Sequence, residues 1–150
     1  MVEPSLSVTI RPLEPQDEAR WRVLWDGYLE FYKSSVSADV TNTTWARLLD
    51  PDSQVFGWVA EVDGVVQGFV NCVLHANTWT TAPVCYLEDL YTAPDARGQG
   101  AGRGLIEAVT TRAKTESWHR VYWRTNADNV TAQALYDKLA KRTAWVTYEA

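Results

Sequence analysis

The sequence is poor in the residues that build metal sites and covalent cross-links. Its 150 residues include two cysteines and two histidines. Cys72 and Cys85 stand in separate apolar stretches and form no metal motif such as CxxC, so we expect reduced, packed thiols in a cytoplasmic protein. His75 and His119 have no partner motif, and we interpret both as structural. The sequence therefore predicts no metal centre.

Long hydrophobic runs are also missing. No stretch approaches the roughly 18 apolar residues that a membrane-spanning helix requires. Residues 1–10 contain no basic segment followed by an apolar one, so we expect no signal peptide. Without a repeat, a low-complexity tract or a linker, residues 1–150 are expected to form a single domain. A chain of this length buries roughly 70% of its unfolded surface and folds without cross-links.

Positive charge is in deficit, whereas tryptophan is in excess. The chain has 14 basic and 19 acidic residues, for a formal net charge of −5. This balance disfavours a nucleic-acid partner and suits a cationic one, although solubility alone also explains it. The eight tryptophans serve equally well in cores, interfaces and cation–π contacts, so their number alone does not choose a function.

The hydrophobic periodicity predicts a mixed α/β fold in the order β-α-α-β-β-β-α-β-α-β. Alternating or Val-rich runs predict strands at residues 6–13, 55–62, 65–74, 84–92, 121–125 and 145–148. Asp63-Gly64 is a hairpin turn signal. Apolar residues at helical spacing predict helices at about residues 15–33, 43–49, 105–116 and 132–139. Residues 34–42 are expected to form a polar loop.

A glycine-rich loop joins the strand at residues 84–92 to the following helix. Its sequence, RGQGAGRG, starts at Arg97. Such a loop presents unpaired N–H groups and the positive end of the helix dipole, and its glycines let a phosphate approach the backbone. Arg97 and Arg103 add charged donors. The segment therefore predicts a phosphate or pyrophosphate site, although it matches neither a P-loop nor a dinucleotide fingerprint.

Arg97-x-x-Gly100-x-Gly102 resembles the Arg/Gln-x-x-Gly-x-Gly/Ala signature of the GNAT superfamily of acetyl-CoA-dependent N-acetyltransferases. The strand sequence LEDLY at residues 87–91 and the segment NADNVTAQALY at residues 126–136 stand at the distances seen in that family. The resemblance covers nearly the whole chain. It implies a central mixed, mostly antiparallel, splayed sheet flanked by helices, and an acyltransferase activity.

The resemblance also implies where acetyl-CoA binds. The pyrophosphate would lie on the amides of the glycine-rich loop, and the pantetheine arm would pair with the strand before it. Asn129 matches a family asparagine that contacts the cofactor. The implied cofactor-binding residues are Leu90, Tyr91, Thr92, Arg97, Gly98, Gln99, Gly100, Ala101, Gly102, Arg103 and Asn129.

The implied reaction requires a base and an acid. A primary amine is protonated at neutral pH and must lose a proton before it attacks, and the leaving thiolate must gain one. Glu88 and Asp89 are the candidate bases, and they face opposite sides of the strand unless a bulge intervenes. Their Leu-Glu-Asp context resembles the polyamine acetyltransferases, in which the glutamate acts through a water, and this favours Glu88. Tyr136 matches a family tyrosine near the CoA sulfur, which makes it the candidate acid. Because no cysteine nucleophile is evident, we expect direct transfer.

The acceptor site is expected where the first two helices meet the sheet. Residues 25–32 and 141–148 resemble the histone/polyamine acetyltransferase-like branch, in which the terminal segment often helps to form a dimer, so we expect a homodimer. The terminal segment departs from the commoner Gly-Phe ending of the family. The hypothesis is a small amine or polyamine acceptor, with a protein lysine or an amino acid as the alternative. A catalytically idle, CoA-binding sensory module is the alternative of a different class. The implied acceptor-binding residues are Trp25, Tyr28, Tyr32 and Trp45.

Overall fold

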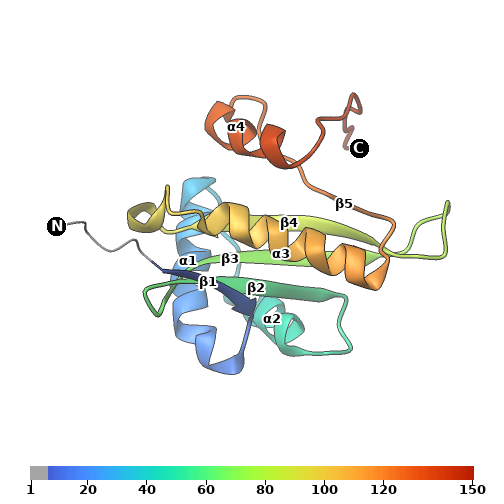
Figure 1. The fold of residues 1–150 in the computed structure, drawn as a ribbon. Helices are drawn as coiled ribbons and strands as arrows, with labels where there is room; N and C mark the ends of the chain where they lie inside the picture. Colours follow the sequence, from blue (N-terminus) through green and yellow to red (C-terminus); the bar gives the residue numbers. More distant parts are fainter. Residues whose placement is uncertain (1–6) are drawn as a thin grey trace.

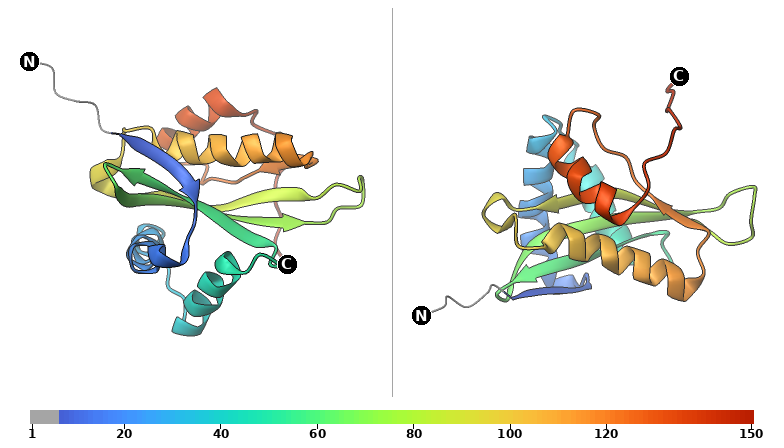
Figure 2. Two further views of the ribbon diagram at one scale, coloured as in Figure 1. Left: turned by 60° about the horizontal axis from the view of Figure 1, so that its bottom comes forward. Right: turned by 45° about the horizontal axis from the view of Figure 1, so that its top comes forward.

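In the computed structural model, which describes residues 7–150, a five-stranded sheet separates two layers of helices (Figures 1 and 2). Helices α3 and α4 cover one face of the sheet, and α1 and α2 cover the other (Figure 2). The helices are α1 (Glu18–Phe31), α2 (Ala38–Leu49), α3 (Ala101–Glu116) and α4 (Val130–Leu139). The strands are β1 (Val8–Pro12), β2 (Val55–Val62), β3 (Val65–His75), β4 (Val84–Thr92) and β5 (Arg120–Tyr122).

The sheet has the spatial order β1-β2-β3-β4-β5. The first four strands pair antiparallel, and β5 joins β4 in parallel. The predicted hairpin between β2 and β3 is confirmed, because Asp63 and Gly64 both have positive φ values, 50° and 82°, as the tight turn between twisted strands requires. The expectation of a mixed, mostly antiparallel sheet flanked by helices is therefore confirmed.

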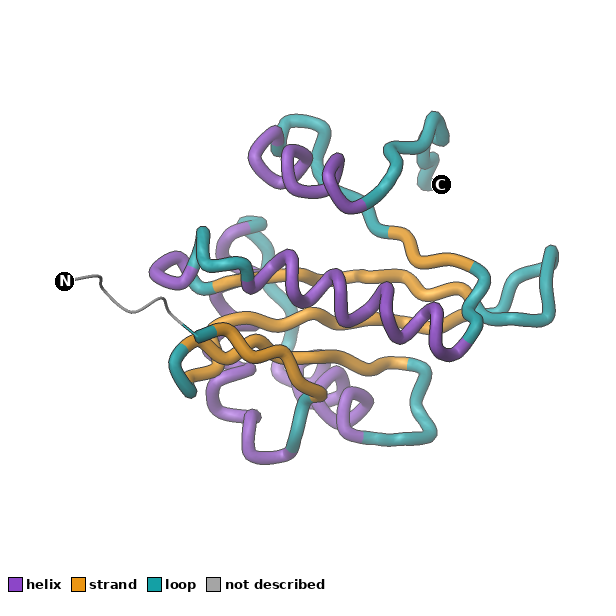
Figure 3. Tube along the Cα trace, viewed as in Figure 1, coloured by secondary structure: helices purple, strands orange, loops and turns teal. Residues whose placement is uncertain are grey.

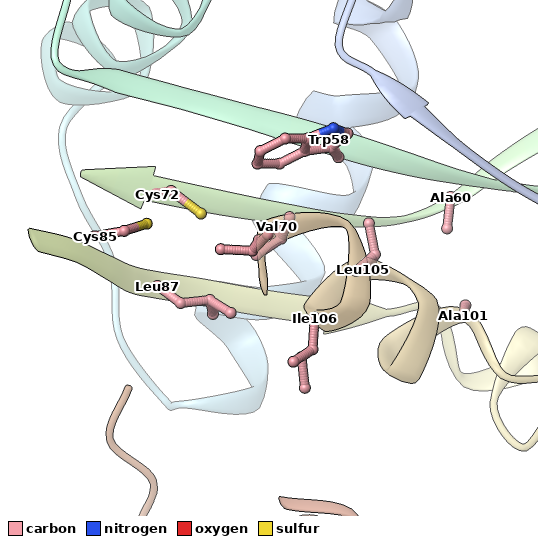
Figure 4. Packing of buried hydrophobic residues seen from close by; sticks show 10 residues of the cluster. Trp58, Ala60, Val70, Cys72, Cys85, Leu87, Ala101, Leu105 and Ile106 are labelled. Carbon is pink, nitrogen blue, oxygen red and sulfur yellow. The ribbon is translucent and has the colours of Figure 1, made fainter. Parts of the chain in front are cut away.

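Two hydrophobic clusters hold the helices on the sheet. Between α3 and strands β2, β3 and β4 lies a core that includes Trp58, Val70, Leu87 and Leu105 (Figure 4). The two thiols, Cys72 and Cys85, belong to this core, and both are buried and free. On the other face, α1 and α2 pack on the sheet through a cluster with three tryptophans, which are Trp21, Trp25 and Trp45.

Helix α2 begins five residues before the predicted start at residue 43. Ser37 caps it, because its hydroxyl accepts a hydrogen bond from the Val40 amide at 3.3 Å. The prediction of a loop through residue 42 was wrong because this polar stretch contains a cap signal, and residues 38–42 are helical. Helix α3 also begins earlier than residue 105, because Gly100 takes the left-handed conformation, with φ at 92°, at its N-cap.

The C-terminal part of the sheet is smaller than predicted. Strand β5 ends at Tyr122, and the chain then leaves the sheet toward α4 (Figures 1 and 3). The prediction of a strand at residues 145–148 was wrong, because these residues make no ladder and Trp145 and Tyr148 are 90% and 91% exposed. Residue 6 of the predicted first strand lies outside the described residues. No helix within residues 7–150 has the length and apolar character to cross a membrane.

The close approach of β2 to β3 at Gly57 generates a prediction about stability. A Cβ atom at Gly57 would lie 2.4 Å from the Val70 carbonyl oxygen, which is backbone and cannot turn aside. We expect Gly57→Ala to lower the free energy of unfolding by about 1–3 kcal/mol, measured by denaturant unfolding.

Gly102→Ala is the matched control, because its Cβ would meet only Leu135 Cδ2, at 3.9 Å. We expect its stability to stay within about 1 kcal/mol of the parent. A Gly57→Ala protein that unfolds at the parent's denaturant concentration would contradict the assigned strand contact.

Candidate active site

A bulge in β4 sets the direction of the candidate bases. In the ladder between β3 and β4, Asn71 pairs with Asp89 and Cys72 pairs with Leu87, which leaves Glu88 as the extra residue. Leu87 and Leu90 therefore both pack on the α3 side of the sheet. Asp89 is turned to the opposite side, where α1 lies, as its contact with Tyr28 shows. The bulge thus allows both acidic residues to serve one site.

Asp89 is the anchored carboxylate of the pair. The Asn71 amide donates to its Oδ2 atom at 3.0 Å, and Asn71 itself is 2% exposed. Burial raises the pKa of Asp89, and the hydrogen bonds from Asn71 and Tyr28 lower it in part. Sequence reasoning missed Asn71, although a buried asparagine in an otherwise apolar strand was the available signal. Within the described residues its Oδ1 atom is buried without a hydrogen-bond partner.

Glu88 is the exposed carboxylate of the pair. Its pKa is raised by partial desolvation and by the negative charge of Asp89, and the positive charge of Arg124 opposes that rise. Within residues 7–150, no side chain donates a hydrogen bond to this carboxylate. Glu88 is therefore in contact with water, whereas Asp89 is held by the protein.

Three tyrosines from two helices gather beside these carboxylates. The rings of Tyr28 on α1 and Tyr32 at its C-cap meet edge-on, with centroids 5.0 Å apart. Burial raises the pKa of Tyr32, and the nearby charge of Asp89 adds to the effect. Burial also raises the pKa of Tyr136 on α4, with a smaller contribution from Tyr32. Tyr136 is further held by Trp123, at a ring centroid distance of 5.6 Å. The predicted residues Tyr28, Tyr32, Glu88, Asp89 and Tyr136 thus come together.

The other two predicted acceptor residues lie deeper in the molecule. Trp25 and Trp45 are each 6% exposed in the core that joins α1 and α2 to the sheet. The indole of Trp25 stacks on Tyr28 at 5.6 Å, and its N–H donates to the Thr41 hydroxyl at 3.1 Å. Trp25 therefore supports Tyr28 directly, whereas Trp45 packs on Trp21, with ring centroids 5.2 Å apart.

The gap beside β4 is defined by where its pairing with β5 stops. The last pair is Tyr86 with Tyr122, and beyond it no strand within residues 7–150 pairs with residues 87–92 of β4 on that side. We call this gap the splay (Figure 3). The expected cofactor residues Leu90, Tyr91 and Thr92 lie along this open edge, whose backbone groups are available to an extended ligand.

The glycine-rich loop fits a pyrophosphate. Gly98 and Gly100 have positive φ values of 80° and 92°, and a Cβ atom on either would meet nothing within 4 Å, so the backbone is open to a ligand. No side chain caps the N-terminus of α3, which leaves its first amides available. This geometry matches the N–H donors that the phosphates of acetyl-CoA require.

The charged and capping residues of the expected cofactor site have protein partners. Arg97 donates to the Thr92 carbonyl oxygen at 3.0 Å, and Arg103 pairs with Glu107 at 2.8 Å. The Oδ1 atom of Asn129 caps α4 by accepting from the Ala132 amide at 3.1 Å. Among residues 7–150, no group of His, Cys, Asp or Glu side chains is placed to hold a metal ion.

Comparisons with known proteins agree with this architecture. Residues 19–140 match the model of the acetyltransferase (GNAT) family. The D-amino-acid N-acetyltransferase HPA3 of Saccharomyces cerevisiae is 38% identical over 144 residues, which cover 95% of this chain and 89% of that protein.

Two solved structures share the fold. A ribosomal-protein-alanine N-acetyltransferase from Brucella melitensis biovar Abortus 2308 superposes with a TM-score of 0.80 at 24% identity, over 96% of this chain and 99% of that one. The aminoglycoside N-acetyltransferase AAC(6')-Iy in complex with CoA superposes with a TM-score of 0.82 at 21% identity, over 100% of this chain and 98% of that one. With the family match over residues 19–140, the chain belongs to the acetyltransferase (GNAT) family, whose members use acetyl-CoA, and it is an N-acetyltransferase.

Proposed function

We propose that the protein transfers an acetyl group from acetyl-CoA directly to a small primary amine that binds in the splay. The observation that carries this proposal is the gathering of two carboxylates and a tyrosine from different elements at one open strand edge. Glu88 and Asp89 come from the bulge in β4, and Tyr136 comes from α4. An idle CoA-binding module would have no need for a proton acceptor and a proton donor at this place.

The two carboxylates divide the work on the amine. Asp89, held by Asn71 and Tyr28, binds the ammonium group of the acceptor. Glu88 is exposed and takes the proton through a water, and its raised pKa makes it a better base than an ordinary carboxylate. The aromatic rings of Tyr28 and Tyr32 add cation–π stabilisation to the same ammonium group.

Tyr136 supplies the proton that the reaction needs at its end. Acetyl-CoA provides the acetyl group as a thioester, and CoA leaves as a thiolate. Because burial raises the pKa of Tyr136, its hydroxyl stays protonated at neutral pH and serves as the general acid. The side chain is held against Trp123, so the hydroxyl is presented from a defined position.

The cofactor-binding roles follow the same geometry. The amides of Gln99, Ala101, Gly102 and Arg103 would bind the pyrophosphate, with Gly98 and Gly100 keeping the approach open. Leu90, Tyr91 and Thr92 would pair with the pantetheine arm along the open edge of β4. Arg97 orders the loop through Thr92, and Asn129, whose Oδ1 atom caps α4, would contact the cofactor through its side-chain nitrogen.

The acceptor is a small molecule in this proposal. The yeast relative acts on D-amino acids, and AAC(6')-Iy is an aminoglycoside acetyltransferase. D-amino acids and aminoglycosides are small molecules with amino groups. The two proteins therefore support a small amine, polyamine or amino acid as the acceptor more directly than a protein lysine. We also propose that the chain acts as one cytoplasmic domain and forms a homodimer through residues 141–148, where Trp145 and Tyr148 are exposed.

A thiol-release assay with acetyl-CoA over a panel of amines tests the function. The panel contains D- and L-amino acids, their decarboxylated amines, spermidine, an aminoglycoside and a lysine peptide. We expect acetyl-dependent thiol release with at least one small amine. CoA binding in calorimetry without thiol release from any panel member would instead support the idle module.

The general acid is tested by Tyr136→Phe. Removal of the hydroxyl leaves the ring and its contact with Trp123, so we expect kcat to fall on the order of 100-fold while acetyl-CoA affinity stays close to the parent value. Steady-state kinetics and calorimetry measure the two quantities. A variant with unchanged kcat would remove the acid role from Tyr136.

The role of Asp89 is tested through Asn71. In Asn71→Leu the carboxylate loses a hydrogen bond that stabilises its charged form, so its pKa rises further. Because Asp89 binds the ammonium group when ionised, kcat/KM is lost as pH falls through this pKa. We therefore expect the acid limb of the kcat/KM profile to move to higher pH.

Asn42→Leu is the matched control, because Asn42 is an exposed asparagine on α2 that bonds Arg22. Its pH profile should coincide with that of the parent. An acid limb that stays in place in Asn71→Leu would show that ionisation of Asp89 is not required.

A further inference from the structure

The far wall of the splay has a cation that the proposed reaction does not use. Tyr86 and Tyr122 form the last pair between β4 and β5, and their rings stack at 4.9 Å with an angle of 23°. Arg124 follows the end of β5 by two residues and Glu88 follows Tyr86 by two residues on β4, so both lie just beyond the last pair of the ladder. Arg124 therefore stands across the splay from the two carboxylates.

The guanidinium of Arg124 is oriented by the tyrosine of the neighbouring strand. Its Nε atom donates to the Tyr86 hydroxyl at 3.2 Å, and its central carbon lies 5.7 Å from the centroid of the Tyr86 ring. Within residues 7–150, this is the one side-chain hydrogen bond that Arg124 forms. The two terminal nitrogens are thus left as a pair of parallel donors, which is the arrangement that binds a carboxylate through two hydrogen bonds.

Two carboxylates lie near enough to Arg124 for their charges to interact with it. The positive charge of Arg124 acts on Glu88 across the splay, although no ion pair joins them among the described residues. The carboxylate of Glu149, in the exposed C-terminal segment, also acts on Arg124 from outside the sheet. The site therefore has acidic groups for an amine at one wall and, at the other, a guanidinium that forms no ion pair with any residue in the range 7–150.

We propose that Arg124 binds the carboxylate of the acceptor, so that the preferred substrates are amines with a carboxylate close to the reacting nitrogen, as in α-amino acids. This inference rests on the proposed function and deepens it. In this arrangement the ammonium group of the acceptor binds Asp89 and Glu88 at one wall of the splay. Its carboxylate binds Arg124 at the other wall. Tyr86 is a positioning residue, because it engages Nε and leaves the terminal nitrogens to the ligand. A simple polyamine has no group that matches this wall.

The experiment compares acceptors that differ only in the carboxylate. Phenylalanine and methionine, each as the D- and the L-form, are paired with phenethylamine and 3-(methylthio)propylamine. The readout is the specificity ratio, which is kcat/KM for the amino acid divided by kcat/KM for its decarboxylated partner. We expect the parent protein to favour the amino acid, with a ratio well above one.

Arg124→Gln removes the charge and the paired donors. A hydrogen-bonded charge pair of this kind corresponds to a loss of about 10- to 100-fold in affinity, so we expect the specificity ratio to fall by that factor, mainly through KM for the amino acid. Arg124→Lys keeps the charge without the paired donors and should give an intermediate ratio. Because each ratio uses two acceptors on one variant, a change in the pKa of Glu88 affects both and cancels.

Arg120→Gln is the matched control. Arg120 also lies over a tyrosine, at 4.4 Å from the Tyr122 ring centroid, but it pairs with Val84, at the far end of the ladder from the splay. Its specificity ratio should equal that of the parent. A parent ratio at or below one, or a ratio that Arg124→Gln leaves unchanged, would overturn the carboxylate site while acetyl transfer to amines still stands. If none of the amines gave thiol release, the proposed function and this inference would both be overturned.

Discussion

The hydrogen-bond pairing between β4 and β5 stops at Tyr86 and Tyr122, and the rest of the site depends on this interruption. Had the ladder continued, the backbone groups of residues 87–92 would pair with another strand and no extended ligand would reach them. Because the chain leaves β5 for α4, one wall of the gap is built by β4 and the other by the segment that contains Arg124. The bulge at Glu88 adds a local change of direction, which turns Asp89 toward α1.

Desolvation gives these groups their chemical character. Burial raises the pKa of both carboxylates and of the tyrosines on α1 and α4, and the charge of Asp89 extends this effect to Tyr32. A carboxylate with a raised pKa is a better proton acceptor, and a buried tyrosine stays protonated, so one environment suits both roles. Trp25 and Trp45 belong to the core that holds α1 and α2 against the sheet, and Tyr28 packs on this core.

Local signals explain how much of the fold and the site could be predicted. The Asp-Gly turn specifies its hairpin through backbone conformation, and the glycine-rich loop specifies an open helix N-terminus, so both appear in the structure as expected. The start of α2 was missed because the Ser37 cap lies inside a polar stretch that has no apolar periodicity. Residues 145–148 have the composition of a strand, but strand formation requires a partner edge, and the structure provides none. Asn71 was missed because its importance comes from Asp89, eighteen residues away in the chain.

The sequence by itself determined the family, the order of most elements and the identity of the chemical groups, because these follow from short motifs and from patterns within single elements. Only the tertiary structure decided which groups meet. It brought together Tyr32 at the end of α1, Asp89 on β4 and Tyr136 on α4. It also buried both predicted acceptor tryptophans and joined Arg124 to Tyr86 beside the end of the ladder. The physical reason is that a bulge, the end of a ladder and the burial of a side chain each depend on contacts between distant segments, which no local pattern of residues records.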